Sequence, residues 1–223
     1  MKIISNMMLV LFLLGLGTLH AESEEAMELN REGAKLVEQG EMEKALEAFQ
    51  KAVRLDSNDA VALLNLAYTY DRQGRTEEAI TEYQRAIELS PNNLLAYNNL
   101  GVLYDKMGQY DEAIGEFQRA LQIDPTDANT LKNLENAKKS RAVIQEREDK
   151  IAEAQMEADI HPGNPMALYK LGRLYAFYDK KDQAMEWINK ALDKGYDDLD
   201  YLKIDPALTG LREDPRFKEL LQR

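Results

Sequence analysis

Apolar residues recur along most of the chain at the spacing of one face of an α-helix. One segment carries Leu63, Leu66 and Tyr70, and the next carries Tyr83 and Ile87. A glycine between the two segments allows the chain to turn, and a proline after the second segment stops the helix. The pattern therefore predicts a pair of helices joined by a tight turn.

This helical pair recurs along the chain at a constant interval. The heptapeptide LNLAYTY ends at Tyr70, and the similar NNLGVLY ends at Tyr104. Small, turn and aromatic positions repeat at the same interval: Gly33, Ala67 and Gly101; Gly40, Gly74 and Gly108; Phe49, Tyr83 and Phe117. A related pattern returns around Gly172, with Asp179 at the turn position. One such pair cannot bury its own apolar face, so the units are expected to stack.

These positions resemble the tetratricopeptide repeat, a helix–turn–helix unit of about 34 residues. The resemblance covers three contiguous repeats, 26–59, 60–93 and 94–127, and a fourth at 165–198. It implies an all-α fold, a right-handed superhelical solenoid of antiparallel helix pairs.

The segment 128–164 departs from the repeat. It begins in step, but Glu135 takes the small position and Ala142 takes the place of the turn glycine. Two interpretations follow: a degenerate helical pair, or a single charged helix of about 30 residues, roughly 45–50 Å long. We favour the pair.

The last segment, 199–223, contains Asp205-Pro206 and Asp214-Pro215. Asp followed by Pro is a common helix start, because Asp caps the helix and Pro suits its first turn. We expect two or three short helices that form a C-terminal cap on the fourth repeat.

The N-terminus has the pattern of an export signal. Lys2 precedes an apolar run over 7–17, and Ala21 stands before an acidic stretch. We expect residues 1–21 to be a signal peptide, cleaved after Ala21 or kept as an N-terminal membrane anchor. The protein would then be exported, to the periplasm or outside the cell. The absence of cysteine excludes a lipoprotein anchor.

Composition removes several classes of function. A net charge of −12 disfavours nucleic-acid partners and anionic membrane surfaces. The chain lacks cysteine, and after the signal it keeps one histidine, His161, in a turn before Pro162. Phosphate-loop, zinc-protease and nucleophile-elbow motifs are absent. We therefore expect no catalytic residue, no metal, no cofactor and no small-molecule substrate, and the chain is not expected to be an enzyme.

Asparagines repeat with the same period. Asn65, Asn99 and Asn133 are evenly spaced, one repeat apart, so stacked repeats would place them in a column along the inner helices. An amide both donates and accepts, so it can pair with a peptide backbone without reading its sequence. The family resemblance implies a peptide-binding groove there, with candidate contacts at Asn30, Asn65, Tyr68, Asn98, Asn99 and Asn133. The alternative is that the amides only bond to the neighbouring repeat.

Some members of the family clamp the terminal carboxylate of a partner with basic groove residues. The matching positions here carry Asn30, Ala34, Asn65, Leu95 and Asn99, and only Asn65 fits that pattern. A clamp for a chaperone tail is therefore not expected.

We expect a non-enzymatic protein-interaction scaffold that binds a partner peptide or helix in its concave groove within the cell envelope. The alternative is a structural self-assembler, in which the middle helix or the C-terminal cap mediates homo-oligomers.

Overall fold

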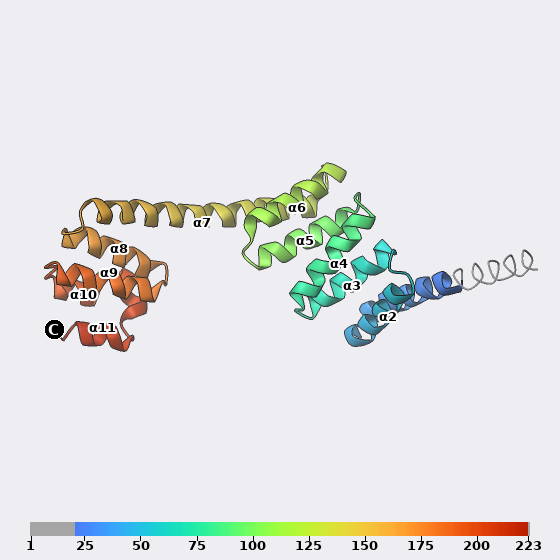
Figure 1. The fold of residues 1–223 in the computed structure, drawn as a ribbon, viewed down its shortest axis with the longest axis horizontal. Helices are drawn as coiled ribbons and strands as arrows, with labels where there is room; N and C mark the ends of the chain where they lie inside the picture. Colours follow the sequence, from blue (N-terminus) through green and yellow to red (C-terminus); the bar gives the residue numbers. More distant parts are fainter. Residues whose placement is uncertain (1–20, 223) are drawn as a thin grey trace, which may run out of the picture. The chain divides into compact units, whose positions relative to one another are not determined.

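The structure is a computed structural model that describes residues 21–222. The described residues form two compact units, which divide between Ser140 and Arg141. Their regular secondary structure is entirely helical (Figure 1). The expected all-α repeat fold is therefore confirmed. The expected export segment, residues 1–21, lies outside the described residues except for its last residue, Ala21.

Unit 1 is a stack of antiparallel helix pairs (Figure 1). Residues 21–38 are helical and pair with the first labelled helix. The labelled helices of the three repeats are α2 (Met42–Leu55), α3 (Ala60–Arg72), α4 (Thr76–Leu89), α5 (Leu94–Lys106) and α6 (Tyr110–Ile123). The first helix of each pair is called the inner helix below, and the second the outer helix.

Local sequence fixes where these helices turn. Gly40, Gly74 and Gly108 adopt φ angles of 79°, 74° and 76°, which a residue with a Cβ atom rarely adopts. Asp59 and Asn93 cap α3 and α5, because their side chains accept hydrogen bonds from backbone N–H groups of the first turn.

The small residues of the repeat lie against the aromatic ones. A Cβ atom on Gly101 would lie 2.7 Å from the ring of Phe117, and one on Gly33 would lie 2.6 Å from the ring of Phe49. In the second repeat Ala67 and Tyr83 are both fully buried. This close approach of inner and outer helices explains why a small residue returns at the same position of each repeat.

The segment after the third repeat is a single helix, α7 (Ala128–Ile160), of 33 residues. The favoured interpretation of residues 128–164 as a helical pair is therefore wrong. Ala142 stands where a glycine turns the chain in the other repeats, and alanine has the highest helix propensity. Although α7 is long, none of the helices in residues 21–222 is apolar enough to cross a membrane.

Unit 2 contains the fourth helix pair and a cap. The pair is α8 (Pro165–Phe177) and α9 (Lys181–Asp193), and Asp179 adopts the left-handed conformation at their turn, with φ 56°. The cap consists of α10 (Leu199–Ile204), a 3₁₀ helix η1 (Pro206–Leu211) and α11 (Pro215–Leu220). Leu202, Leu208, Leu211, Phe217 and Leu220 of the cap are buried in one cluster with α8 and α9.

Candidate binding groove on the inner helices

Unit 1 contains a groove of about 310 Å³ along its three inner helices. Side chains from residues 21–38, α3 and α5 line most of it, and α2 contributes one aromatic ring. The lining residues are Ala34, Val37, Glu38, Phe49, Leu64, Asn65, Tyr68, Leu95 and Asn99. Six of them are aliphatic or aromatic, and only Glu38 carries a charge.

Apolar groups in this groove face water. Leu95, in the first turn of α5, is 58% exposed. Leu64 and Tyr68 lie one turn apart on α3 and are half-buried. A concave apolar surface with a few amides at its edge is the usual composition of a binding pocket. Its volume is at the small end for a ligand site, so it suits one or two apolar side chains.

Two of the three predicted column asparagines bond to the neighbouring inner helix. Asn65 Nδ2 donates to Asn30 Oδ1 over 2.9 Å, and Asn133 Nδ2 donates to Asn98 Oδ1 over 3.1 Å. These four residues hold adjacent repeats together. Asn30, Asn98 and Asn133 are not part of the groove lining, whereas Asn65 is.

Asn99 differs from the other two. The residue that corresponds to Asn30 and Asn98 in the second repeat is Leu64, whose side chain has no hydrogen-bonding group. Among the described residues, no hydrogen bond joins the Asn99 amide to a neighbouring inner helix, as it does for Asn65 and Asn133. Asn99 lines the groove beside Tyr68 and Leu95. Its amide is therefore the one in the column that repeat stacking does not use.

The Tyr83 side chain is fully buried, and its hydroxyl has no hydrogen-bond partner of acceptable geometry. Burial raises its pKa well above the ordinary value for tyrosine, Asp71 raises it further, and the Asn99 side chain acts in the opposite direction. The hydroxyl therefore keeps its proton near neutral pH.

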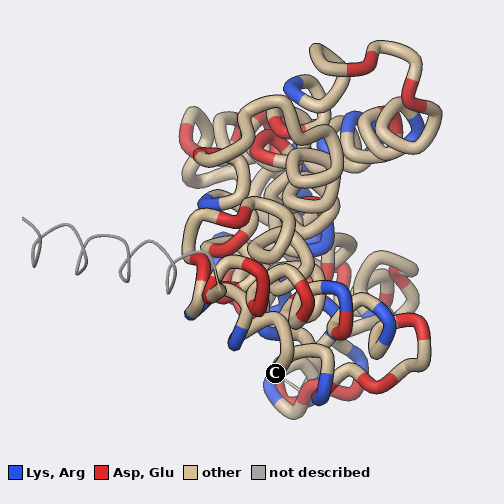
Figure 2. Tube along the Cα trace, turned by 90° about the vertical axis from the view of Figure 1, so that its right-hand side faces the viewer, with Lys and Arg blue, Asp and Glu red and all other residues tan. Residues whose placement is uncertain are grey.

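An ion pair joins the inner helices of the second and third repeats. Lys106 Nζ on α5 lies 2.9 Å from an oxygen of Asp71 on α3. One repeat later, the position of Lys106 is taken by Ser140, and one buried oxygen of Asp105 has no hydrogen-bond partner. Acidic and basic residues are interleaved along the chain (Figure 2).

In unit 2 the C-terminal cap contacts α8 on the face that corresponds to the inner face of the unit 1 repeats. Tyr169 corresponds to Asn98, and its hydroxyl donates to Asp205 Oδ2 over 2.5 Å. Arg173 Nε donates to the same oxygen over 2.7 Å. Asp205 is fully buried, and Tyr169 also stacks on Tyr196 with ring centroids 4.3 Å apart. The inner face of the fourth repeat is thus occupied by the protein's own C-terminal segment.

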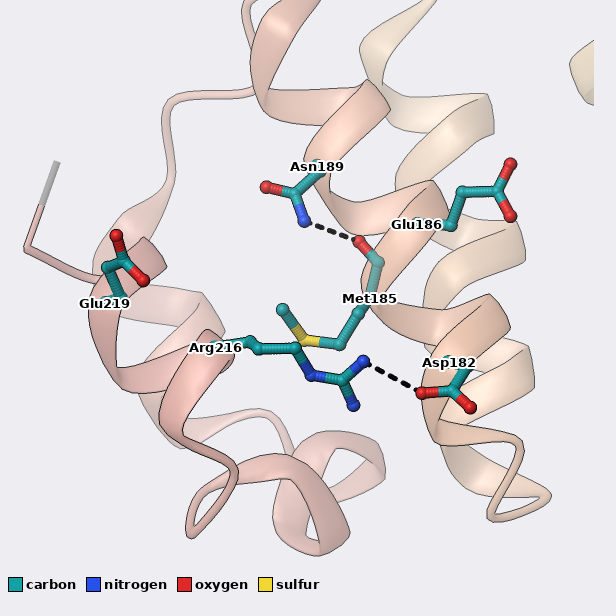
Figure 3. A pocket seen from close by; sticks show the side chains of 6 residues that line it. All are labelled: Asp182, Met185, Glu186, Asn189, Arg216 and Glu219. Carbon is teal, nitrogen blue, oxygen red and sulfur yellow. Dashed lines mark hydrogen bonds and ion pairs between the residues drawn. The ribbon is translucent and has the colours of Figure 1, made fainter.

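A second cleft, of about 400 Å³, lies between α9 and α11. Figure 3 shows Arg216 reaching from α11 to Asp182 on α9, a distance of 2.8 Å, with Met185 beside it. Asn189 donates to the backbone oxygen of Met185. Because Arg216 also pairs with Asp214, its charge is satisfied within the protein. This cleft has fewer apolar groups than the groove of unit 1 and is the weaker candidate.

Sequence reasoning did not anticipate the whole groove. It singled out Asn65, Tyr68 and Asn99, which lie together, but not Val37 and Glu38, which follow Ala34 by one helical turn. That helical spacing was the available signal. It also did not anticipate that Leu64 would leave the Asn99 amide without a hydrogen-bond partner on the neighbouring inner helix. Within residues 21–222, no cluster of three or more potential metal ligands occurs.

Comparison with known families supports the repeat assignment. Models described as TPR repeat match residues 33–74 and 71–108. Models described as tetratricopeptide repeat match residues 95–127 and 167–193. Such repeats typically act as protein-interaction modules without enzymatic activity. No curated protein matches the sequence.

Solved structures share the architecture. The MamA protein is 26% identical, with a TM-score of 0.50, and the match covers 77% of this chain and 92% of that one. YrrB, described as a TPR protein with an unusual peptide-binding site, is 23% identical over 82% of this chain and 93% of its own, with a TM-score of 0.50. The first TPR of Spaghetti (RPAP3), solved with the HSP90 peptide SRMEEVD, is 23% identical over 54% and 95%, with a TM-score of 0.53. The small, aromatic and turn positions, the stacked helix pairs and these matches lead to one conclusion: the chain belongs to the tetratricopeptide repeat family.

Proposed function

We propose that the protein is an interaction scaffold whose unit 1 groove binds an extended internal segment of a partner protein. The observation that carries this proposal is the combination of exposed Leu95 with the amide of Asn99, which repeat stacking leaves unused. An apolar partner side chain would enter between Leu64, Tyr68 and Leu95. Asn99 would pair with the partner's backbone.

Energetics favour an apolar anchor. Burial of a large apolar side chain contributes roughly 1.5–3 kcal/mol, and a small number of such anchors usually dominates peptide binding. Tyr68 adds a rigid aromatic surface with a polar tip, which is typical of binding hot spots.

The groove chemistry also argues against one kind of partner. The acidic peptide SRMEEVD binds the first TPR of RPAP3. In the present groove no lining residue is basic, and Glu38 is acidic. A terminal carboxylate would enter without a cation to pair with, which is unfavourable in a partly desolvated site. The partner segment is therefore internal to its chain, with an apolar anchor.

The test begins with a phage-displayed library of random dodecapeptides selected on the purified full chain. A selected peptide, blocked at both ends, is then titrated against Leu95→Gln and against Leu89→Gln as the matched control. Both leucines are exposed in unit 1, but Leu89 lies on outer helix α4 and does not line the groove. We expect Leu95→Gln to weaken binding at least tenfold and Leu89→Gln to leave it unchanged.

Two results would overturn the proposal. One is a selected peptide that binds both variants equally well, which would move the site elsewhere. The other is stronger binding of SRMEEVD than of the blocked peptide, which would indicate a carboxylate clamp. Light scattering of the free protein serves as a further control, because a stable dimer that excludes the peptide would place a second copy in the groove.

We also propose that this binding takes place in the cell envelope. The support is the sequence of residues 2–21, with its single lysine, apolar run and terminal alanine. N-terminal sequencing of protein from fractionated cells tests this. An intact N-terminus in the cytoplasmic fraction would contradict it.

A further inference from the structure

The groove of unit 1 has a carboxylate at one end. Val37 and Glu38 are the last two residues of the first inner helix, and Leu95 lies in the first turn of α5. Helix α3 bonds to the first inner helix on one side and to α5 on the other, so Glu38 and Leu95 lie at opposite ends of the groove. Backbone carbonyl groups give a helix C-terminus a partial negative charge. The Glu38 end is therefore negative through both its side chain and its backbone.

Glu38 reverses the charge found at the same position in the next two repeats. Arg72 and Lys106 occupy that position, and each is the basic residue in the last turn of its helix. A basic side chain is favoured there because it interacts with the partial negative charge of the helix C-terminus, whereas a glutamate is disfavoured. Helix formation therefore does not explain the carboxylate of Glu38.

The Glu38 carboxylate is also unpaired. Lys106 pairs with Asp71 of the preceding inner helix over 2.9 Å. The same step back from Arg72 reaches Val37, which carries no charge. Among the described residues, the Glu38 side chain takes part in neither a hydrogen bond nor an ion pair. This end of the groove thus offers a carboxylate that the contacts of unit 1 leave free.

The surroundings of this carboxylate suit a long basic side chain. Ala34, Val37 and Tyr68 line the same groove, and none of the lining residues is basic. Lysine or arginine can lay its aliphatic stem along such a surface while its charged end reaches the carboxylate. Apolar walls lower the local dielectric constant, which strengthens the attraction between the two charges. The net charge of −12 also attracts a basic segment from a distance.

We propose that Glu38 is a specificity-determining residue, which selects a lysine or arginine of the segment bound in the groove. This inference rests on the proposed groove function and defines the partner more closely. The bound segment carries an apolar anchor at one end, which packs against Leu95, and a basic side chain at the other, which pairs with Glu38.

The test uses the blocked phage-selected peptide and variants of the full chain. Glu38→Gln removes the charge, and Glu38→Lys reverses it. Glu32→Gln is the matched control, because Glu32 is an exposed glutamate of the same helix that does not line the groove. At low ionic strength we expect Glu38→Gln to weaken binding about three- to fivefold, as for an ion pair near the surface. Glu38→Lys should weaken it about tenfold, and Glu32→Gln should leave it unchanged. The loss in Glu38→Gln should shrink as salt is added.

Changes in the peptide identify the side chain that Glu38 meets. Each lysine or arginine of the peptide is replaced in turn by norleucine, which keeps an aliphatic stem but no charge. For one of these peptides, Glu38→Gln should change the affinity no further, which is the result for two groups that interact directly. The same peptide with glutamate at that position should bind Glu38→Lys more tightly than it binds the wild type.

The outcomes of the two proposals can be told apart. If Leu95→Gln weakens binding while Glu38→Gln and Glu32→Gln have equal effects, the role of Glu38 is overturned and the groove function stands. Selected peptides without a basic residue would overturn that role as well. If Leu95→Gln leaves binding intact, the groove function itself fails. Because Glu38 is exposed, its variants should fold, which circular dichroism checks.

Discussion

Asn133 on α7 donates to Asn98 Oδ1 on α5 over 3.1 Å, and Thr130 donates to the same oxygen over 3.2 Å. In the first two repeats, Asn65 and Asn30 make the corresponding bond with no second donor to the acceptor oxygen among the described contacts. The same asparagine–asparagine bond therefore occurs at two places, and at the second place Thr130 adds another hydrogen bond to the acceptor oxygen.

This difference predicts an order of stability effects. Asn65→Ala should lower the free energy of unfolding by about 1 kcal/mol, because it leaves half-buried Asn30 without its partner. Asn133→Ala should cost less, since Thr130 still bonds to Asn98. Asn99→Ala should cost least. Urea denaturation of the three variants measures the order, and a cost for Asn99→Ala as large as that for Asn65→Ala would contradict it.

Gly101 provides a second prediction. Gly101→Ala should destabilise unit 1 by about 1 kcal/mol, because the added Cβ atom lies 2.7 Å from the ring of Phe117, which must shift. The matched control is Gly115→Ala, where an added Cβ atom meets nothing within 4 Å. That change should stabilise the protein by about 0.5–1 kcal/mol through helix propensity. Thermal unfolding of the two variants should therefore shift in opposite directions.

Most of the fold was predictable from the sequence, because each repeat carries the small and turn residues that its helix pair needs. Glycines at 40, 74 and 108 are needed for a left-handed turn, and glycines at 33 and 101 are needed for close packing on an aromatic ring. The same reasoning failed at α7. The loss of the turn glycine at Ala142 was visible, but the periodicity of the repeat favoured a bend, whereas local helix propensity favoured continuation.

The candidate site was less predictable from sequence. The column of asparagines was recognised, but which amides are used for stacking depends on the residue that each one meets across the helix interface. Asn65 meets Asn30 on the preceding inner helix and bonds to it. At the equivalent position of the next repeat, Asn99 meets Leu64, which cannot form a hydrogen bond through its side chain. The contact between inner helices, rather than the repeat pattern, distinguishes them.

Asp205 gives a prediction about pH. Burial disfavours its ionised form, but hydrogen bonds from Tyr169, the Ala207 N–H and Arg173 outweigh that effect and hold the pKa of Asp205 below its usual value. A carboxyl with a lowered folded-state pKa stabilises the protein above its unfolded pKa, and this contribution is lost as the pH falls through the folded value.

Asp205→Asn should therefore destabilise unit 2 by about 1–2 kcal/mol near neutral pH, where the charge-assisted bonds are lost. Below about pH 4 the difference from the wild type should shrink, because the wild-type carboxyl is then progressively protonated. Denaturation of both proteins across this range checks the sign. A difference that grows in acid would rule out the stabilising role of the carboxylate.

The middle of α7 should open more readily than its two ends. Between Ala137 and Ala158 none of its residues is fully buried, so local hydrogen bonds and pairs such as Lys150 with Glu146 hold this stretch. Backbone amides near Ala142 should exchange faster than those near Ala137 and Ala158, and Ala142→Gly should accelerate them further. Hydrogen-exchange mass spectrometry measures this, and uniform protection along the helix would show the expectation to be wrong.

Leu64 occupies the position that carries Asn30 and Asn98 in the other two repeats, and this difference has a consequence for how such an array can change. Under the proposed groove function, the residue that the preceding inner helix places opposite an asparagine determines whether that amide bonds to the neighbouring repeat or is left for a partner, so binding would depend on the order of the repeats. Removal of residues 60–93 would join Asp59 to Leu94 and place Asn99 opposite Asn30, as Asn65 is now. Duplication or loss of one repeat could thus create or erase a binding position without any change to the residue that makes the contact.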